Sequence, residues 1–191
     1  MEDMGMVFIL FSFYLMFSKL CYTARRLKIE AETDPLTELF NRRSFFRELE
    51  KRIKSGERFS VAILDLDNMK RINDTLGHQE GDRVLEAVSK ALKKSIREDD
   101  LAARYGGDEF AVLFTRQGPP PEKFRGRFKA NLDAELAKLK NENLKELSFS
   151  LGLAYYPQDG QDISSLLRIA DTKMYAEKEA KKKSCRDSRI T

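Results

Sequence analysis

Two short β-rich segments in the middle of the chain, separated by a pair of glycines, constrain the fold most strongly. Residues 101–105 and 110–114 both favour strands, and Gly106-Gly107 can take the positive φ values that a tight turn requires. The pattern predicts a β-hairpin at this place. Because hairpin strands are antiparallel neighbours, a purely parallel sheet is excluded.

Helices and further strands are predicted around this hairpin. Helical spacing of apolar residues predicts a helix at 41–54 that ends before Gly56, and another around 84–92. Strands are expected at 59–64 and 147–155, and helices at 122–141 and 164–182. These elements predict an α+β fold, with a central, mostly antiparallel or mixed sheet flanked by helices on one or both faces.

The first 23 residues differ sharply in hydropathy from the rest. Fifteen of the nineteen residues from Met4 to Tyr22 are apolar or aromatic. About 20 such residues span a bilayer core, and Lys19 can extend toward the headgroups from within the segment. The basic residues that follow, Arg25, Arg26 and Lys28, favour a cytoplasmic location for the rest of the chain. We therefore expect a single-pass transmembrane anchor at 1–23 and a short helical linker at 24–33.

Two alternatives for this segment are a cleaved signal peptide and a buried core helix. A signal peptide needs a basic start and a small-residue cleavage site, whereas this chain begins with Glu2 and Asp3. Four phenylalanines in ten positions without a polar face disfavour the core helix. The linker is expected to end before Pro35, because the residue preceding a proline avoids the helical region.

Charge and cysteine content exclude several other classes of protein. The 35 basic and 31 acidic residues give a net charge of 35 − 31 = +4, which is too even for a protein that coats duplex DNA, so no nucleic-acid partner is expected. Two distant cysteines and a single histidine, His78, exclude a cysteine–histidine zinc site and make a disulfide scaffold a poor interpretation.

Carboxylates recur where strands end. Asp65 and Asp67 follow the strand at 59–64, and Asp108-Glu109 follow the glycine pair. If these strands are neighbours, the acids converge, and oxygen ligands without histidine or cysteine suit Mg²⁺. The alternative is that they are solvated turn residues, since aspartate is common in turns.

At this point the chain resembles the GGDEF domain family, the diguanylate cyclases, over residues 33–186. Gly106, Gly107, Asp108, Glu109 and Phe110 reproduce the motif that names the family, after Arg104-Tyr105. Five further blocks occur in the family's order and spacing: DPLTELFNRR at 34–43, DLDNMKRIND at 65–74, GHQEGD at 77–82, SLGLA at 150–154 and ADTKMYAEK at 170–178. The implied domain covers 34–186 and leaves a tail at 187–191.

The resemblance implies a palm-like nucleotidyl-cyclase fold and the condensation of two GTP into cyclic di-GMP with release of two pyrophosphates. It implies a homodimer, since each domain binds one GTP, and two Mg²⁺ (or Mn²⁺) ions per active site. By similarity, Asp65, Asp108 and the carbonyl of Leu66 are metal ligands. Glu109 is the candidate proton acceptor, a role that Asp108 could share.

The resemblance also implies the residues that bind substrate and product. Asn73 and Asp82 match the residues that read guanine, and Lys70, Lys178 and Lys182 match those that bind phosphate. Arg97 and Asp100 match the RxxD site at which the product inhibits the enzyme; a surface ion pair is the alternative. The alternative to catalysis is a GGDEF receptor that only binds GTP or cyclic di-GMP. With the expected N-terminal anchor and its basic flank, the expected location is the bacterial inner (cytoplasmic) membrane, with the catalytic domain in the cytoplasm.

Three departures from the family pattern are visible. The usual Gly-Arg-Asn of the tail is Lys181-Lys182-Lys183 here, and a lysine lacks the bidentate geometry of arginine. We therefore expect weaker triphosphate binding through Lys182, and solvated side chains for Lys181 and Lys183. Glu38 and Met69 stand where the family often has glycine and phenylalanine, and neither removes a ligand. His78 is expected to be structural, and no activating signal can be inferred.

Overall fold

The computed structural model describes the backbone of residues 2–144 and 147–187, and it leaves out the side chains of residues 2–12, 24, 28, 30 and 185–187. A five-stranded sheet in the order β1-β3-β4-β2-β5 forms its centre. The strands are β1 (Phe40–Asn41), β2 (Phe59–Asp67), β3 (Leu101–Arg104), β4 (Glu109–Phe114) and β5 (Ser148–Tyr156). Strand β1 pairs in parallel with β3, and the other neighbours are antiparallel. The predicted α+β fold with a mixed sheet is confirmed.

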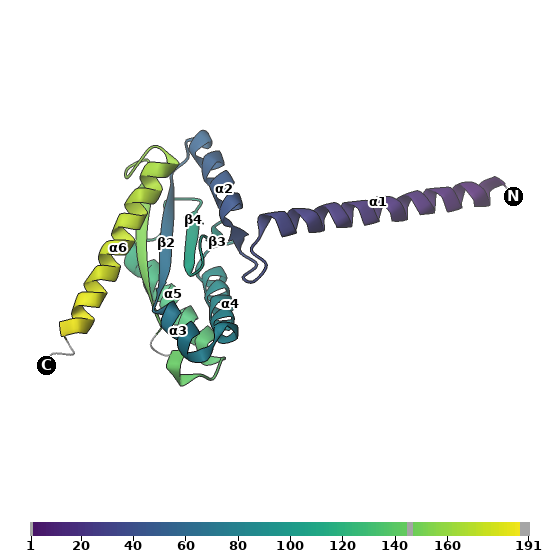
Figure 1. Cartoon of the computed structure of the whole chain (residues 1–191). Coiled ribbons are helices and arrows are strands. Elements are labelled where there is room, and N and C mark those ends of the chain that lie inside the picture. The colour runs from purple at the N-terminus through teal and green to yellow at the C-terminus, as the bar shows by residue number, and fades with distance from the viewer. Residues whose placement is uncertain (1, 145–146, 188–191) are drawn as a thin grey trace.

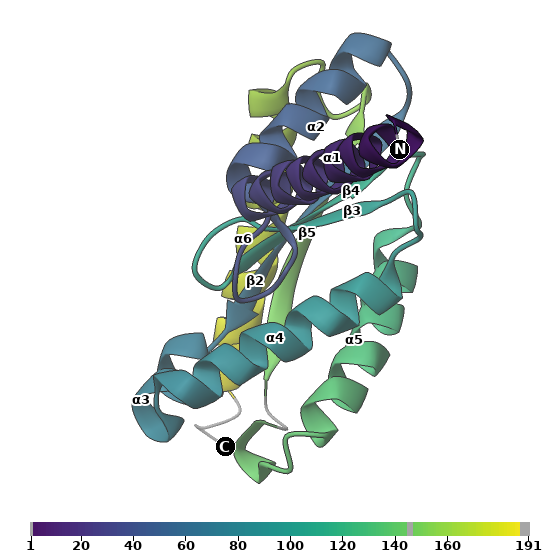
Figure 2. The same cartoon turned by 90° about the vertical axis from the view of Figure 1, so that its right-hand side faces the viewer.

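Helices cover both faces of the sheet. On one face α2 (Arg42–Ser55) and α6 (Ile163–Asp187) pack against alternate residues of β2, including Val61 and Ile63. On the other face α4 (His78–Ser95) and α5 (Pro121–Ala137) pack against residues such as Leu64 and Phe110. The short α3 (Met69–Leu76) and the 3₁₀ helix η1 (Glu142–Leu144) complete the elements. Figure 2 shows α4 and α5 crossing one side of the sheet together.

Local sequence explains the ends of helix α2. The side chain of Asn41 accepts a hydrogen bond from the backbone N–H of Ser44 at 3.0 Å and so caps the first turn. Gly56 ends the helix with φ of 68°, a left-handed conformation that glycine adopts without strain. The predicted helix at 41–54 is therefore confirmed to within one residue.

Strand β2 continues three residues beyond the predicted end. Asp65 and Asp67 lie within it rather than after it. Hydroxyl groups of Ser148 and Ser150 donate to the two oxygens of Asp67, at 2.7 and 2.9 Å. These bonds from β5 compensate the burial of the carboxylate, which allows the strand to extend past Leu64.

The N-terminal helix α1 (Glu2–Glu32) projects away from the sheet (Figure 1). It ends before Asp34-Pro35, as predicted, and joins the predicted anchor and linker in one helix. Large apolar side chains from Phe13 to Ile29 are exposed along it. Within the part of the chain that the structure describes, no helix is long and apolar enough to cross a membrane. About half of the predicted anchor, residues 1–12, has side chains that lie outside that description, and the anchor stays a prediction.

Candidate active site

Asp65 and Glu109 face each other across two paired strands. Asp65 of β2 is the register partner of Glu109 at the start of β4. Next to this pair, the backbone N–H of Leu66 donates to the carbonyl of Asp108 at 3.2 Å. The predicted convergence of the acids of β2 with those of the hairpin is therefore confirmed. The pairing brings Glu109 opposite Asp65, while Asp108 stays in the turn beside Leu66.

Glu109 lies over the first glycine of the turn. A Cβ atom added to Gly106 would come within 2.5 Å of Oε2 of Glu109, so glycine at this position makes room for the carboxylate. Burial raises the pKa of Glu109, and the negative charges of Asp65, Asp171 and Asp108 raise it further, while Lys178 opposes them. Asp171 of α6 is thus a neighbour of the site that the sequence did not single out.

The acids suit a hard divalent cation. Among the residues that the structure describes, no group of three or more histidine, cysteine, aspartate or glutamate side chains is arranged to hold a metal ion. Mg²⁺, however, usually takes one or two carboxylates and completes its shell with water and substrate phosphates. This donor set is matched by the carboxylates of Asp65 and Glu109, which place two negative charges close together, and by the carbonyl oxygen of Leu66. The predicted ligand Asp108 lies on the cavity side of the same turn.

A cavity of about 510 Å³ opens next to the turn, and the predicted guanine-reading residues Asn73 and Asp82 line it. It is lined by Asp108 and Gly107 of the turn, Arg104 of β3, Met69, Lys70, Asn73 and Asp74 of α3, and His78, Asp82 and Leu85 of α4. The close packing of α3 against α4 positions Asn73, because a Cβ at Gly81 would lie 1.9 Å from its Oδ1. The structure thus brings Lys70, Asn73, Asp82 and Asp108 together.

The lysines of α6 approach the acids from the neighbouring helix. Lys178 Nζ lies 2.5 Å from Oδ1 of Asp65. Lys181 Nζ lies 3.1 Å from Oδ2 of Asp67, so the expectation of a solvated side chain at Lys181 is wrong. Lys182 pairs with Glu179 one turn earlier, at 2.8 Å. The structure therefore brings Lys178 to the acids and leaves Lys182 on the outer side of the helix.

Burial alone would raise the pKa of Asp67, but hydrogen bonds from Ser148, Lys181 and Ser150 outweigh it and lower the pKa. Asp67 is consequently a satisfied, charged group that joins β2, β5 and α6. Its role in this structure is to hold the end of β2, two residues along the strand from Asp65.

The predicted inhibitory pair lies away from the cavity. The carboxylate of Asp100 accepts from the backbone N–H groups of Arg97 and Thr115, both at 3.0 Å. Asp100 is therefore buried and shapes the turn between α4 and β3, while the side chain of Arg97 is exposed at the surface. Arg97 and Asp100 interact through the backbone N–H of Arg97, which donates to the carboxylate of Asp100, and not through the surface ion pair that was the alternative.

A link from the start of the domain to the turn was not expected. Arg104 donates to both oxygens of Asp34 at 3.3 Å and, through Nε and Nη2, to the carbonyl of Gly107 at 3.2 and 2.9 Å. Burial would raise the pKa of Asp34, but bonds from Thr37 and the charge of Arg104 lower it. The segment after α1 is thereby tied to the residue that precedes Asp108. Asp34 and Arg104 both lie in segments that resemble the family. That resemblance was the signal in the sequence that could have pointed to this link.

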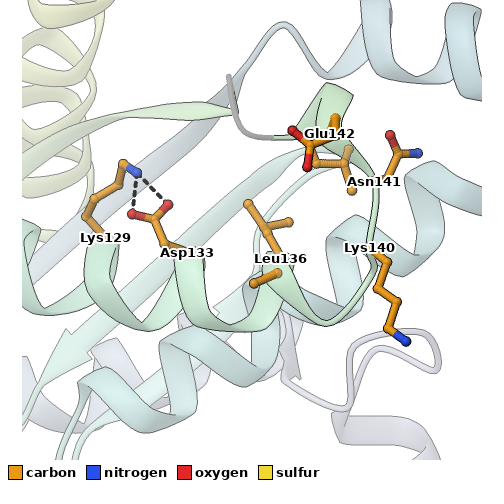
Figure 3. A pocket seen from close by; sticks show the side chains of 8 residues that line it. Lys129, Asp133, Leu136, Lys140, Asn141 and Glu142 are labelled. Atoms are coloured by element: carbon orange, nitrogen blue, oxygen red, sulfur yellow. Dashed lines mark hydrogen bonds and ion pairs between the residues drawn. The ribbon is translucent and has the colours of Figure 1, made fainter.

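A second cavity, of about 590 Å³, lies at the C-terminal end of α5 (Figure 3). Lys129 and Asp133 form an ion pair on its wall, at 2.5 and 2.6 Å, and Leu136 also lines it. Asn141 and Glu142, which follow α5 in the chain, line it as well. It contains none of the predicted site residues, so the acid cluster and its adjoining cavity are the candidate active site.

Comparisons with known proteins agree with this geometry. The family model for the diguanylate cyclase GGDEF domain matches residues 31–184. Probable diguanylate cyclase DgcT of Escherichia coli strain K12 is 32% identical over 182 residues, which cover 84% of this chain and 37% of that protein. Diguanylate cyclase DosC of the same strain is 37% identical over 154 residues, which cover 78% and 33%. The chain spans about a third of the length of these two relatives.

Two solved structures share the fold. The coiled coil and GGDEF domain of DgcB from Caulobacter crescentus, in complex with c-di-GMP, aligns with a TM-score of 0.72 at 29% identity, over 87% of this chain and 91% of that one. Diguanylate cyclase SiaD from Pseudomonas aeruginosa, in complex with its activator SiaC, aligns with a TM-score of 0.65 at 26% identity, over 94% and 69%. The chain belongs to the GGDEF domain family of diguanylate cyclases.

Proposed function

We propose that this chain is a diguanylate cyclase, which condenses two GTP molecules into cyclic di-GMP and releases two pyrophosphates. The observation that carries the proposal is the meeting of Asp65 and Glu109 beside a cavity that contains Asn73 and Asp82. In this arrangement Asp65 and Glu109 would bind the metal that carries the phosphates, and Asn73 and Asp82 would bind guanine in the cavity. The named activity of relatives DgcT and DosC supports it.

In the proposed reaction two identical steps occur. The 3′-hydroxyl oxygen of one GTP attacks the α-phosphorus of the other, a new P–O bond forms, and the bond from the α-phosphorus to the bridging oxygen breaks. Its electron pair leaves with pyrophosphate. The hydroxyl proton goes to a carboxylate of the turn, and Glu109, which lies opposite Asp65, is the candidate acceptor. Two Mg²⁺ or Mn²⁺ ions held by Asp65, Leu66 and the acids of the turn would stabilise the triphosphate charge.

Specificity for guanine follows from the chemistry of the cavity. A carboxylate at Asp82 can accept hydrogen bonds from the ring N–H and the exocyclic amino group of guanine, whereas adenine presents no such pair of donors. The amide of Asn73 lies beside it, pressed against Gly81. Lys70 on the cavity wall and Lys178 at Asp65 supply positive charge for the triphosphate. Lys182, which pairs with Glu179 on the outer side of α6, does not join them in this arrangement.

We further propose that the active enzyme is a homodimer and that its product inhibits it. One domain offers one guanine-reading cavity, and the reaction needs two GTP molecules facing each other. The exposed Arg97, held by the Asp100 turn, is a suitable contact for a phosphate or guanine of the product. The solved complex of the DgcB domain with c-di-GMP is consistent with product binding in this family.

Attachment to a bacterial inner membrane through residues 1–23 is also our proposal, and it rests on the apolar sequence from Met4 to Tyr22. Membrane fractions of cells that express the full chain are washed with carbonate to test it. The chain should stay in the pellet. Recovery of the full-length chain in the supernatant would contradict membrane attachment.

Incubation of the full chain with labelled GTP and Mg²⁺ tests the activity. Cyclic di-GMP should form, and Asp65→Asn should lose nearly all of it, because loss of a metal-binding carboxylate removes several kcal/mol of transition-state stabilisation. Asp133→Asn, the same substitution in the second cavity, should retain wild-type turnover. Binding of GTP or cyclic di-GMP without turnover in the wild-type chain would instead identify a non-catalytic receptor.

A further inference from the structure

Three polar side chains on α6 lie along the outer edge of the sheet. Lys173, Glu177 and Lys181 are spaced four residues apart, so they share one face of the helix. Each meets a backbone group of β5, the edge strand of the sheet. The contacts are Lys173 Nζ to the carbonyl of Leu153 at 2.8 Å, the N–H of Leu151 to Oε2 of Glu177 at 3.2 Å, and Lys181 Nζ to the carbonyl of Phe149.

The contacts are in register because helix and strand have nearly equal repeats. Four residues of an α-helix rise about 6 Å, and two residues of a strand rise about 6.7 Å. From one contact to the next, the residue number on α6 rises by four, from 173 to 181, while the residue number on β5 falls by two, from 153 to 149. Side chains of α6 thus satisfy the outward backbone groups of an edge strand, which would otherwise face water or another chain. A register shift of α6 would break all three bonds together.

Glu177 and Lys181 also contact α5 and the end of β2, whereas the further partner of Lys173 is Asp159, after β5. Arg125 of α5 forms a bidentate ion pair with Glu177, with Nη1 at 2.8 Å from Oε1. Lys181 Nζ also lies 2.8 Å from Oε1 of Glu177 and 3.1 Å from Asp67. Burial would raise the pKa of Glu177, but these hydrogen bonds from Arg125 and Lys181 lower it. Helices from opposite faces of the sheet therefore meet at the edge of β5.

Lys178 follows Glu177 directly and points to the active site instead of the edge. Its Nζ lies 2.5 Å from Asp65, and it is partly buried, with 28% of its side chain exposed. The position of this ammonium group depends on the rotation and axial position of the last turns of α6. Those turns are held by the bonds of Glu177 and Lys181 on either side of it.

We propose that Glu177 and Lys181 are positioning residues, which set the register of α6 on β5 and thereby place Lys178 at Asp65 and at the substrate triphosphate. This inference rests on the proposed function, because it assigns Lys178 to GTP. It also assigns a role to Lys181, whose bonds to Phe149 and Asp67 fasten the helix next to the phosphate-binding lysine.

A double-mutant cycle on the full chain tests the proposal. Glu177→Ala and Lys181→Met are each made with Lys178 present and in a Lys178→Met background, and kcat, KM for GTP and the unfolding midpoint are measured. Glu177→Gln keeps an acceptor for the N–H of Leu151 and serves where Glu177→Ala fails to fold. Lys173→Met is the matched control, because it breaks the same kind of bond to β5, together with an ion pair to Asp159, five residues from Lys178.

Residues that act through Lys178 lose their effect when it is absent. With Lys178 present, Glu177→Ala and Lys181→Met should raise KM about three- to ten-fold, with a smaller change in kcat, and Glu177→Gln should fall between them and wild type. In the Lys178→Met background the change should be below about two-fold. Lys173→Met should lower the unfolding midpoint and leave KM unchanged.

Equal fold changes in both backgrounds would overturn the proposal, as would a rise in KM for Lys173→Met as large as that for Lys181→Met. Failure of the proposed function has a different signature, since the wild-type chain would then consume no GTP. In that event the same cycle is measured as the affinity for a non-hydrolysable GTP analogue. The presence or absence of coupling to Lys178 decides the positioning role there too.

Discussion

Gly152 of β5 determines how closely helix α6 approaches the sheet, and Gly152→Ala should separate them. An added Cβ would lie 1.9 Å from the carbonyl oxygen of Ala170 and 2.6 Å from the backbone nitrogen of Met174. Ordinary carbon–oxygen contacts are about 3.3 Å or longer, so α6 must move by more than about 1 Å. Both obstructing atoms belong to the helix backbone, so no side-chain rotation relieves the clash.

The magnitude follows from the rigidity of these neighbours. Overpacking of a core costs about 1–3 kcal/mol, and occasionally more. We expect about 3 kcal/mol for Gly152→Ala, because the clash is with backbone. A domain of this size loses roughly 2–4 °C of unfolding midpoint for each kcal/mol, which predicts a decrease of about 6–12 °C. Displacement of α6 also moves Lys178, so KM for GTP should rise.

Thermal unfolding of the full chain, followed by circular dichroism, measures this effect. Gly126→Ala is the matched control, since Gly126 lies in α5 and a Cβ there would have nothing within 4 Å. That substitution should stabilise the protein by about 0.5–1 kcal/mol, because alanine favours the helix. A midpoint for Gly152→Ala within about 2 °C of wild type would refute the packing argument for α6.

Three further predictions concern the cavity, the turn and the cation. Gly81→Ala should displace the side chain of Asn73, whose Oδ1 would lie 1.9 Å from the new Cβ, and should raise KM for GTP about ten-fold with little change in kcat, as steady-state kinetics would show. The pKa of Asp34 is lowered in the folded chain, so its stabilising effect is present above its unfolded pKa of about 3.9 and is lost as pH falls through the folded value. The difference in unfolding midpoint between wild type and Asp34→Asn should therefore be largest near neutral pH and vanish in strong acid; a constant difference would contradict the role of the ion pair with Arg104. Removal of divalent cations with EDTA should abolish turnover and excess Mg²⁺ should restore it, whereas undiminished activity in EDTA would contradict metal dependence.

The hairpin and the acid pair could be predicted because their signals are local. Glycines at 106 and 107 define the turn, and two apolar segments define its strands. Once these strands are neighbours of β2, Asp65 and Glu109 must meet. Predicting which acid of the turn faces Asp65 requires the strand register, which places Glu109 there. From sequence, Asp108 was the expected metal ligand and Glu109 the candidate proton acceptor, but the proton-acceptor role could not be assigned to one of them alone.

Elements that depend on tertiary contacts were missed. Helix α3 is only eight residues long and starts after Asn68, whose φ of 64° is unusual for a residue other than glycine. Strand β1 has two residues and exists through its pairing with β3. The role of Lys181 depends on the alignment of α6 with the edge of β5, and no local pattern in a lysine-rich helix end shows such an alignment.

The stoichiometry and order of the reaction test the central claim most directly. The purified full chain is incubated with GTP and Mg²⁺, and pyrophosphate and cyclic di-GMP are quantified over time and over a range of protein concentrations. The account predicts two pyrophosphates per cyclic di-GMP and a specific activity that rises with protein concentration as homodimers form. Release of GDP and phosphate, or the absence of cyclic di-GMP with Asp65 and Glu109 intact, would contradict it.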